Sequence, residues 1–171
     1  MIRADERRTV ATAEGGRLAA LYEAHAPEAA RLAFLLTGDR ALAEDIVHEA
    51  FVRLLGRFRD LRHPEAFRAY LRTTVVNMTR SHFRRRRVER AYVEREGRAP
   101  KVPPADPGGR HEMWDALQSL QPRQRAAIVL RYYEDLTEAQ TAEVLGCAVG
   151  TVKSLVSRGL DRLRAEIPRG G

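Results

Sequence analysis

The chain has 171 residues, with 30 lysines and arginines against 23 acidic residues, and its hydrophobic content of 44% is ordinary for a folded protein. Its first residues are charged and lack the apolar core of a signal peptide, and no apolar run approaches the ~20 residues that span a bilayer. We therefore expect a cytoplasmic protein without membrane insertion, and the net charge of +7 favours polyanionic partners. The single cysteine, Cys147, excludes an internal disulfide, and no Cys/His set predicts a metal site.

The composition predicts an all-α fold, because alanine, leucine and arginine dominate while β-branched clusters are scarce. Residues 1–14 are polar and are expected to form a flexible N-terminal arm. From Leu18 to Leu36 the apolar residues recur at helical spacing. Pro27 is expected to break or restart this first helix, and Gly38 to end it.

A second helix is predicted to follow at once, with Asp39 as its N-cap. Its apolar residues form a stripe wide enough for one side to face a core. They are Leu42, Ile46, Val47, Phe51, Leu54, Leu55 and Phe58. The acidic side of the helix, with Glu44, Asp45, His48 and Glu49, is expected to lie mostly away from the core.

The third predicted helix carries the whole basic excess of the chain. It begins near Pro64, after a short loop, because proline suits a first helical turn. Between Arg68 and Arg90 there are eight arginines and one glutamate, whereas the other 22 basic residues are matched by 22 acidic ones. The residues predicted to face inward are Phe67, Tyr70, Leu71, Val75 and Met78. Phe67 and Tyr70 could instead stack on unpaired bases, but a core position is the favoured interpretation.

Residues 91–110 differ in composition from the helices on either side. They contain four prolines and three glycines, which is typical of an extended linker at a domain boundary. We therefore predict two small helical domains, 15–90 and 111–167, joined by a flexible linker.

The second domain begins with a short stripe of Met113, Trp114, Leu117 and Leu120, and Pro122 starts its next helix. Thr137 and Gln140 then have the spacing of a capping box, in which each side chain accepts a hydrogen bond from the other's backbone N–H. A final helix is predicted from about Val149 to Ile167.

The last two helices have the pattern of a helix-turn-helix. Ala142 supplies a small residue where the helices would touch, Gly146 a turn, and Val152 an apolar contact in the second helix. That second helix would enter the major groove, where Lys and Arg pair with guanine edges and hydroxyls contact bases or phosphates. Its exposed candidates are Gly150, Thr151, Lys153, Ser154, Ser157, Arg158 and Arg162. A plain helical hairpin with a solvated basic face is the simpler alternative.

In four segments the chain resembles extracytoplasmic-function (ECF) sigma factors, particularly an actinobacterial-looking subgroup. These segments are residues 35–54, 69–87, 120–146 and 149–154. Their order and spacing cover roughly residues 18–165. The resemblance implies a subunit that gives RNA polymerase its promoter specificity, with a region 2-like first domain and a region 4-like second domain.

The resemblance also implies roles for individual residues. Asp45, His48 and Glu49 would dock on the clamp helices of the polymerase's largest subunit, and the second domain on the flap of the second-largest subunit. The first domain would hold the opened −10 element through Arg62, His63, Arg68, Arg72, Asn77, Arg80, Ser81, Arg84, Arg85, Arg86 and Arg87. The recognition helix, together with Thr137 and Gln140, would read the −35 duplex. An anti-sigma partner is a further expectation, and no cofactor is expected.

Two other classes of function fit parts of the sequence. A stand-alone helix-turn-helix regulator would bind duplex operators without polymerase, but it has no obvious use for residues 38–90. A metal-dependent nuclease built from Asp45 and Glu49 is the enzymatic alternative. His48 and Glu49 begin like a zinc-protease motif, but Val52 occupies the place of the second histidine. We therefore expect no enzymatic activity.

Overall fold

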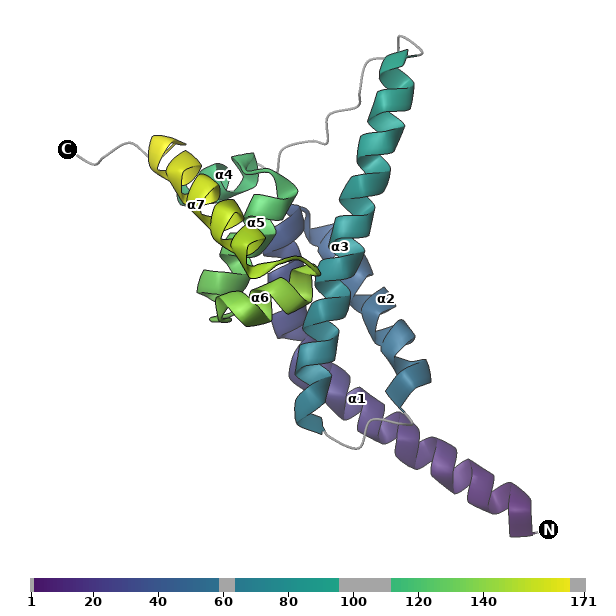
Figure 1. Cartoon of the computed structure of the whole chain (residues 1–171). Coiled ribbons are helices and arrows are strands. Elements are labelled where there is room, and N and C mark those ends of the chain that lie inside the picture. The colour runs from purple at the N-terminus through teal and green to yellow at the C-terminus, as the bar shows by residue number, and fades with distance from the viewer. Residues whose placement is uncertain (1, 59–63, 96–111, 167–171) are drawn as a thin grey trace. The chain divides into compact units, whose positions relative to one another are not determined.

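The structure is a computed structural model that describes residues 2–58, 64–95 and 112–166, with side chains over 15–54, 66–92 and 113–166. Every element in these ranges is helical (Figure 1), which confirms the all-α prediction. The greater part of the predicted linker, residues 96–110, lies outside the described residues. Among the described helices, none combines the length and the apolar character that crossing a membrane requires.

Internal contacts divide the chain into two compact units. The first contains residues 1–34 and 39–75, and the second contains residues 35–38 and 76–171. The long third helix therefore contributes its first part to one unit and its remainder to the other.

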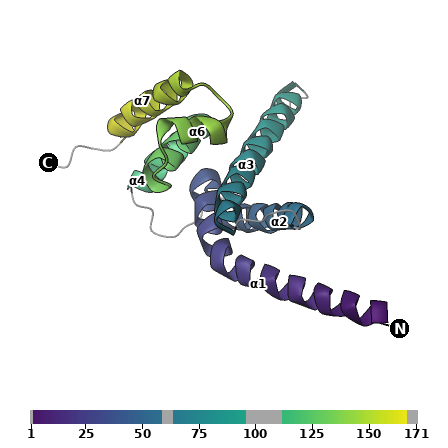
Figure 2. The same cartoon turned by 60° about the horizontal axis from the view of Figure 1, so that its bottom comes forward.

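Helix α1 runs from Ile2 to Thr37 and includes Pro27 in its interior, so the prediction that this proline ends or restarts the helix is wrong. Proline lacks a backbone N–H and its ring crowds the preceding turn, which bends a helix without always ending it. Figure 2 shows that α1 changes direction along its length. The helix ends as predicted at Gly38, whose φ of 73° is a left-handed conformation that glycine adopts readily.

Helix α2, Arg40–Phe58, begins at the predicted cap, where the backbone N–H of Leu42 donates to Asp39 Oδ1 at 3.0 Å. Its predicted stripe is buried from Ile46 to Leu54. The side chains of Leu55 and Phe58 lie outside the described set. The acidic side of α2 is exposed, so the amphipathic pattern placed the two faces of this helix correctly.

Helix α3, Pro64–Arg95, extends five residues into the predicted linker. Phe67 is 1% exposed, and its ring centroid lies 5.5 Å from that of Phe51 on α2 and 5.3 Å from that of His25 on α1. The prediction that Tyr70 faces inward is wrong, because its side chain is 52% exposed. Three residues are less than a full turn of about 3.6, so Tyr70 does not point in the same direction as Phe67. The buried positions of this helix continue instead through Leu71, Val75 and Val76.

The described part of the second unit contains four further α-helices and one π-helical turn. The elements are α4 (Glu112–Ser119), α5 (Pro122–Ile128), the π-helix η1 (Val129–Tyr133), α6 (Glu138–Leu145) and α7 (Val149–Glu166). Their core joins Ala116 and Leu120 to Ile128 and Leu163, with Leu117 and Leu160 packed against it. The π-helical turn was not predicted, because its sequence has no signal that separates it from an ordinary helix end.

Arg125 on α5 is a buried charged residue that hydrophobic patterning did not identify. Its guanidinium donates to Gln118 Oε1 at 2.7 Å, to the Gln118 carbonyl at 2.7 Å and to the Leu120 carbonyl at 3.1 Å. Burial lowers the pKa of Arg125 to about 10, so the group remains charged at neutral pH. Two of these bonds go to backbone carbonyls, that of Gln118 in the last turn of α4 and that of Leu120 just beyond it, where carbonyls lack partners within the helix.

The central position of Phe67 predicts a large effect of truncation. Phe67→Ala should lower the free energy of unfolding by about 3–5 kcal/mol, because it removes the ring and leaves a cavity beside Phe51 and His25. Chemical denaturation followed by circular dichroism measures the change. Tyr70→Ala on the same helix is the control and should have a much smaller effect. Equal losses in the two variants would contradict this description of the core.

Candidate nucleic-acid interface

The turn between α6 and α7 has the geometry predicted for a helix-turn-helix. The capping box is formed in full: the Gln140 backbone N–H donates to Thr137 Oγ1 at 3.1 Å, and the Thr137 N–H donates to Gln140 Oε1 at 2.9 Å. At the other end of α6, Gly146 has a φ of 61°, and Cys147 N donates to the Ala142 carbonyl at 3.0 Å. Local hydrogen bonds therefore define both ends of the first helix.

The recognition helix α7 carries its predicted DNA-binding residues away from the core. Val152 is fully buried, which sets the rotation of α7 about its axis. The predicted residues other than Thr151, which is half-buried, are exposed: Gly150, Lys153, Ser154, Ser157, Arg158 and Arg162. Within this surface, Ser154 Oγ donates to the Gly150 carbonyl at 3.1 Å and Arg158 Nε donates to the Ser154 carbonyl at 3.2 Å.

Thr137 and Gln140 use their side-chain oxygens in the capping box. The Thr137 hydroxyl hydrogen and the Gln140 side-chain amide group remain as donors, and both residues are exposed at the start of α6. These two residues can therefore hold the helix and present donors to a phosphate at the same time. Their contact with DNA remains a prediction.

The arginine run of α3 forms a basic surface. Arg84, Arg85 and Arg87 are exposed and Arg86 is half-buried, and none of the four forms an ion pair with a described residue. Arg68 differs, because it is exposed but pairs with Glu28 of α1. Of the other candidates, Asn77 is exposed, and Arg72, Arg80 and Ser81 are half-buried. Arg62 and His63 lie outside the described residues.

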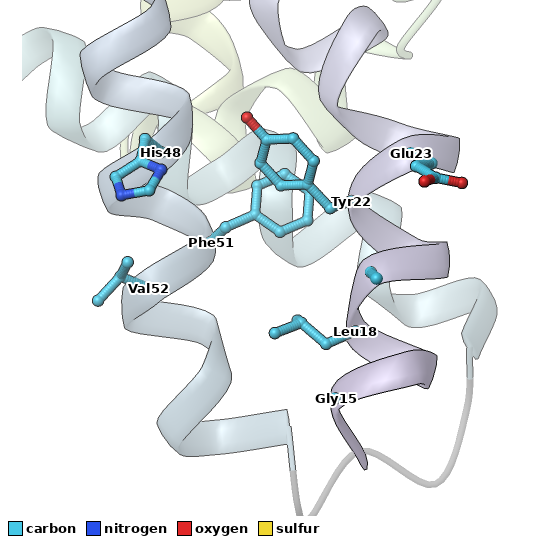
Figure 3. A pocket seen from close by; sticks show the side chains of 8 residues that line it. Gly15, Leu18, Tyr22, Glu23, His48, Phe51 and Val52 are labelled. Atoms are coloured by element: carbon cyan, nitrogen blue, oxygen red, sulfur yellow. The ribbon is translucent and has the colours of Figure 1, made fainter. Parts of the chain in front are cut away.

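The predicted polymerase-binding residues Asp45, His48 and Glu49 are all exposed on α2. Glu49 pairs with Arg53 one turn later, with Arg53 Nη2 and Glu49 Oε1 2.5 Å apart. This surface borders a hollow between α1 and α2 that the sequence pattern did not predict. Figure 3 shows His48 and Val52 on one side of the hollow, and Tyr22 over the ring of Phe51.

The hollow between α1 and α2 exposes apolar surface beside charged residues. Tyr22 is 42% exposed and Val52 is 52% exposed, and the two ring centroids of Tyr22 and Phe51 are 4.7 Å apart. Exposed apolar side chains next to charged ones are typical of protein-binding surfaces. The α2 stripe alone could not predict this feature, because it requires the pairing of α2 with α1.

The described residues contain no group of three or more His, Cys, Asp or Glu side chains that could hold a metal ion. The basic surface of α3 and the exposed side of the helix-turn-helix instead present guanidinium, ammonium, hydroxyl and amide donors, which is the chemistry of polyanion binding.

Comparisons with known proteins place the basic surface of α3 and the exposed side of α7 in two separate regions of one family. Residues 21–89 match the family described as Sigma-70 region 2, and residues 110–163 match Sigma-70, region 4. The RNA polymerase sigma-E factor of Streptomyces coelicolor is 34% identical over 141 residues, which cover 80% of this chain and 78% of that protein. The ECF RNA polymerase sigma factor SigL of Mycobacterium tuberculosis is 34% identical over 166 residues, covering 90% of each chain.

Two solved structures are also similar. The sigma factor RpoE, solved with the anti-sigma factor NepR from Bartonella quintana, aligns with a TM-score of 0.65 at 27% identity, over 85% of this chain and 92% of that one. CnrH, solved with the cytosolic domain of CnrY, aligns with a TM-score of 0.59 at 25% identity, over 91% and 92%. The chain therefore belongs to the sigma-70 family of RNA polymerase sigma factors, and its relatives place it in the ECF group of that family.

Proposed function

We propose that this chain binds core RNA polymerase in the cytoplasm and directs it to promoters by contacting DNA at two places. Helix α7 reads the −35 duplex, and α3 holds the opened −10 element. The observation that supports this most directly is the presence, in one chain of the sigma family, of a capped helix-turn-helix and a separate helix with a run of four arginines, three of them exposed. A regulator that only binds a duplex needs the first of these and not the second.

The two surfaces make different kinds of DNA contact. On α7, Lys153 and Arg158 can donate to guanine O6 and N7, and the hydroxyls of Ser154 and Ser157 can reach bases or phosphates. On α3, the guanidinium groups of residues 84–87 contact phosphates, which attracts any DNA and makes binding depend strongly on salt. Helix α7 thus contributes sequence choice and α3 contributes general affinity.

Promoter opening follows from preferential binding to the unpaired state. A protein surface that binds single-stranded −10 DNA more tightly than the duplex shifts the opening equilibrium without hydrolysing a cofactor. Arg62 and His63 belong to the loop that we assign to capture of a flipped base, whose edge polar groups can read once it leaves the stack. The helix that follows the loop, from Arg72 to Arg87, supplies the positive charge that holds the upstream edge.

The exposed side of α2 and the α4–α7 domain also bind protein partners. The exposed side of α2, with Asp45, His48 and Glu49, docks on the clamp helices of the polymerase's largest subunit, and the adjoining apolar residues Tyr22 and Val52 can extend that contact. The α4–α7 domain docks on the flap of the second-largest subunit. RpoE and CnrH were solved with NepR and CnrY, respectively, and we propose that a protein of the anti-sigma class can likewise cover this chain.

Association with polymerase tests the proposal against a stand-alone regulator. The purified chain should comigrate with core RNA polymerase on a sizing column. The resulting holoenzyme should start run-off transcripts at mapped sites on genomic fragments where core alone does not. Failure to comigrate, combined with tight binding of the chain alone to a defined duplex, would support the stand-alone regulator instead.

The basic surface of α3 should affect all promoters alike. Arg84→Ala combined with Arg85→Ala should lower transcription at every promoter. The slope of log affinity against log salt should fall by roughly 0.7–0.9 for each lost phosphate contact. Run-off assays and salt titrations of holoenzyme binding measure both quantities. The matched control, Arg31→Ala with Arg40→Ala, removes the same charge from two exposed positions in the first unit and should retain activity. Equal losses in the two pairs would refute a specific role for the arginine run.

Lys153 should affect the choice among promoters. Lys153→Ala should change the ranking of −35 variants in run-off transcription, with a discrimination loss of about 1–3 kcal/mol at the base pair it contacts. Glu143→Ala, at an exposed position of α6, should leave the ranking unchanged. An unchanged ranking for Lys153→Ala would show that Lys153 does not read bases.

A further inference from the structure

One ion pair joins the two helices of the helix-turn-helix. Lys153 Nζ lies 3.6 Å from Glu138 Oε2, and the two side chains are 62% and 41% exposed. Glu138 is the first residue of α6, and Lys153 lies in the second turn of α7. A predicted base-reading cation thus has a carboxylate beside it, supplied by the neighbouring helix.

Two of the three other cations of α7, Arg162 and Arg164, also have carboxylate partners, whereas Arg158 donates to the Ser154 carbonyl. Arg162 Nε lies 3.9 Å from Glu166, and Arg164 Nη1 lies 2.9 Å from Asp161. Both of these pairs lie within α7 itself. The run of arginines at residues 84–87 of α3, by contrast, makes no ion pair with a described residue. The two DNA-binding surfaces therefore differ in how their positive charge is compensated.

This difference has a thermodynamic consequence. A lone cation that neutralises a phosphate displaces a condensed counterion, and the slope of log affinity against log salt steepens by about 0.9 for each duplex phosphate. A lysine that brings its own carboxylate adds no net charge, so it displaces no counterion. It can still read a base, because an ammonium has three N–H donors and a single carboxylate contact leaves donors for guanine O6 and N7.

We propose that Glu138 is a positioning residue that acts as the internal counterion of Lys153. The carboxylate holds the ammonium on the groove-facing side of α7 and removes its general attraction for phosphates. Lys153 then contributes to the choice between −35 sequences and contributes little to non-specific affinity. This inference rests on the proposed function, since it assumes that α7 binds the −35 duplex within the holoenzyme.

The test uses holoenzyme assembled from the full chain and core polymerase. Its ligands are a duplex carrying the −35 element of the strongest promoter found by run-off mapping, and a random-sequence duplex of equal length. Binding is measured between 50 and 200 mM salt, where a slope change of 0.9 corresponds to about a 3.5-fold change in relative affinity. Four variants are compared with the unaltered chain: Glu138→Gln, Lys153→Ala, the combination of both, and the control Glu143→Gln.

Glu138→Gln should steepen the slope by about 0.9 and reduce the affinity ratio between the promoter duplex and the random duplex. Lys153→Ala in the Glu138→Gln background should restore the original slope, because both members of the pair are then removed and the local net charge is again unchanged. Glu143→Gln makes the same charge change at an exposed residue of α6 that has no ion pair with a described residue, so it should not steepen the slope in this way. Glutamine keeps the shape of the side chain, and the capping box does not involve residue 138, so α6 should form in each variant.

Two results would overturn this inference and leave the proposed function intact. The first is a slope for Glu138→Gln equal to that of Glu143→Gln. The second is a slope for the combination of both changes that stays as steep as that of Glu138→Gln alone, because the steepening would then not come from Lys153. Absence of a preference for the promoter duplex in the unaltered holoenzyme would be a different result, since it would overturn the proposed function and this inference together.

Discussion

The burial of one side of α7 is the constraint on which the DNA-binding surface depends. Val152 is fully buried, Leu163 is 8% exposed, and Gly159 is buried between them. A Cβ at Gly159 would lie 2.6 Å from Ile128 Cδ1, so α7 and α5 pack closely at this point. A helix held along one side cannot rotate about its axis, and its polar side chains are therefore presented in a fixed order to a groove.

Local signals made much of the fold predictable from sequence. The Thr137–Gln140 box, the left-handed Gly146 and the Asp39 cap each depend on residues only a few positions apart, and all three form as expected. The exposed face of α7 was predictable for the same reason, since helical periodicity assigns its sides once Val152 is placed inward. The acidic side of α2 followed in the same way.

Features that depend on distant residues were not predictable. Tyr70 follows the apolar pattern of α3 well enough to suggest burial, yet its side chain is 52% exposed, because the packing of three helices decides which apolar positions are covered. The hollow beside Tyr22 requires α1 and α2 to be paired. The bonds of Arg125 and the ion pair between Glu138 and Lys153 join different helices, and no single-helix pattern contains them.

Charge compensation links the fold to the division of labour between the two surfaces. Net charge locates the basic excess on α3, but it does not show which cations carry carboxylate partners. The structure shows that α7 holds its lysine and its last arginines in ion pairs, whereas the run at residues 84–87 is uncompensated among the described residues. General attraction to DNA can then be assigned to α3, and selection among promoter sequences to α7.

The central claim is that these two surfaces act together on promoter DNA only when polymerase holds the chain. The most direct measurement compares the affinity of one promoter duplex for the chain alone and for the chain bound to core polymerase, at the same salt concentration. We expect weak, poorly selective binding by the chain alone and tight, selective binding by the holoenzyme. Equal and tight binding in both cases would contradict the account, because the helix-turn-helix would then suffice without polymerase.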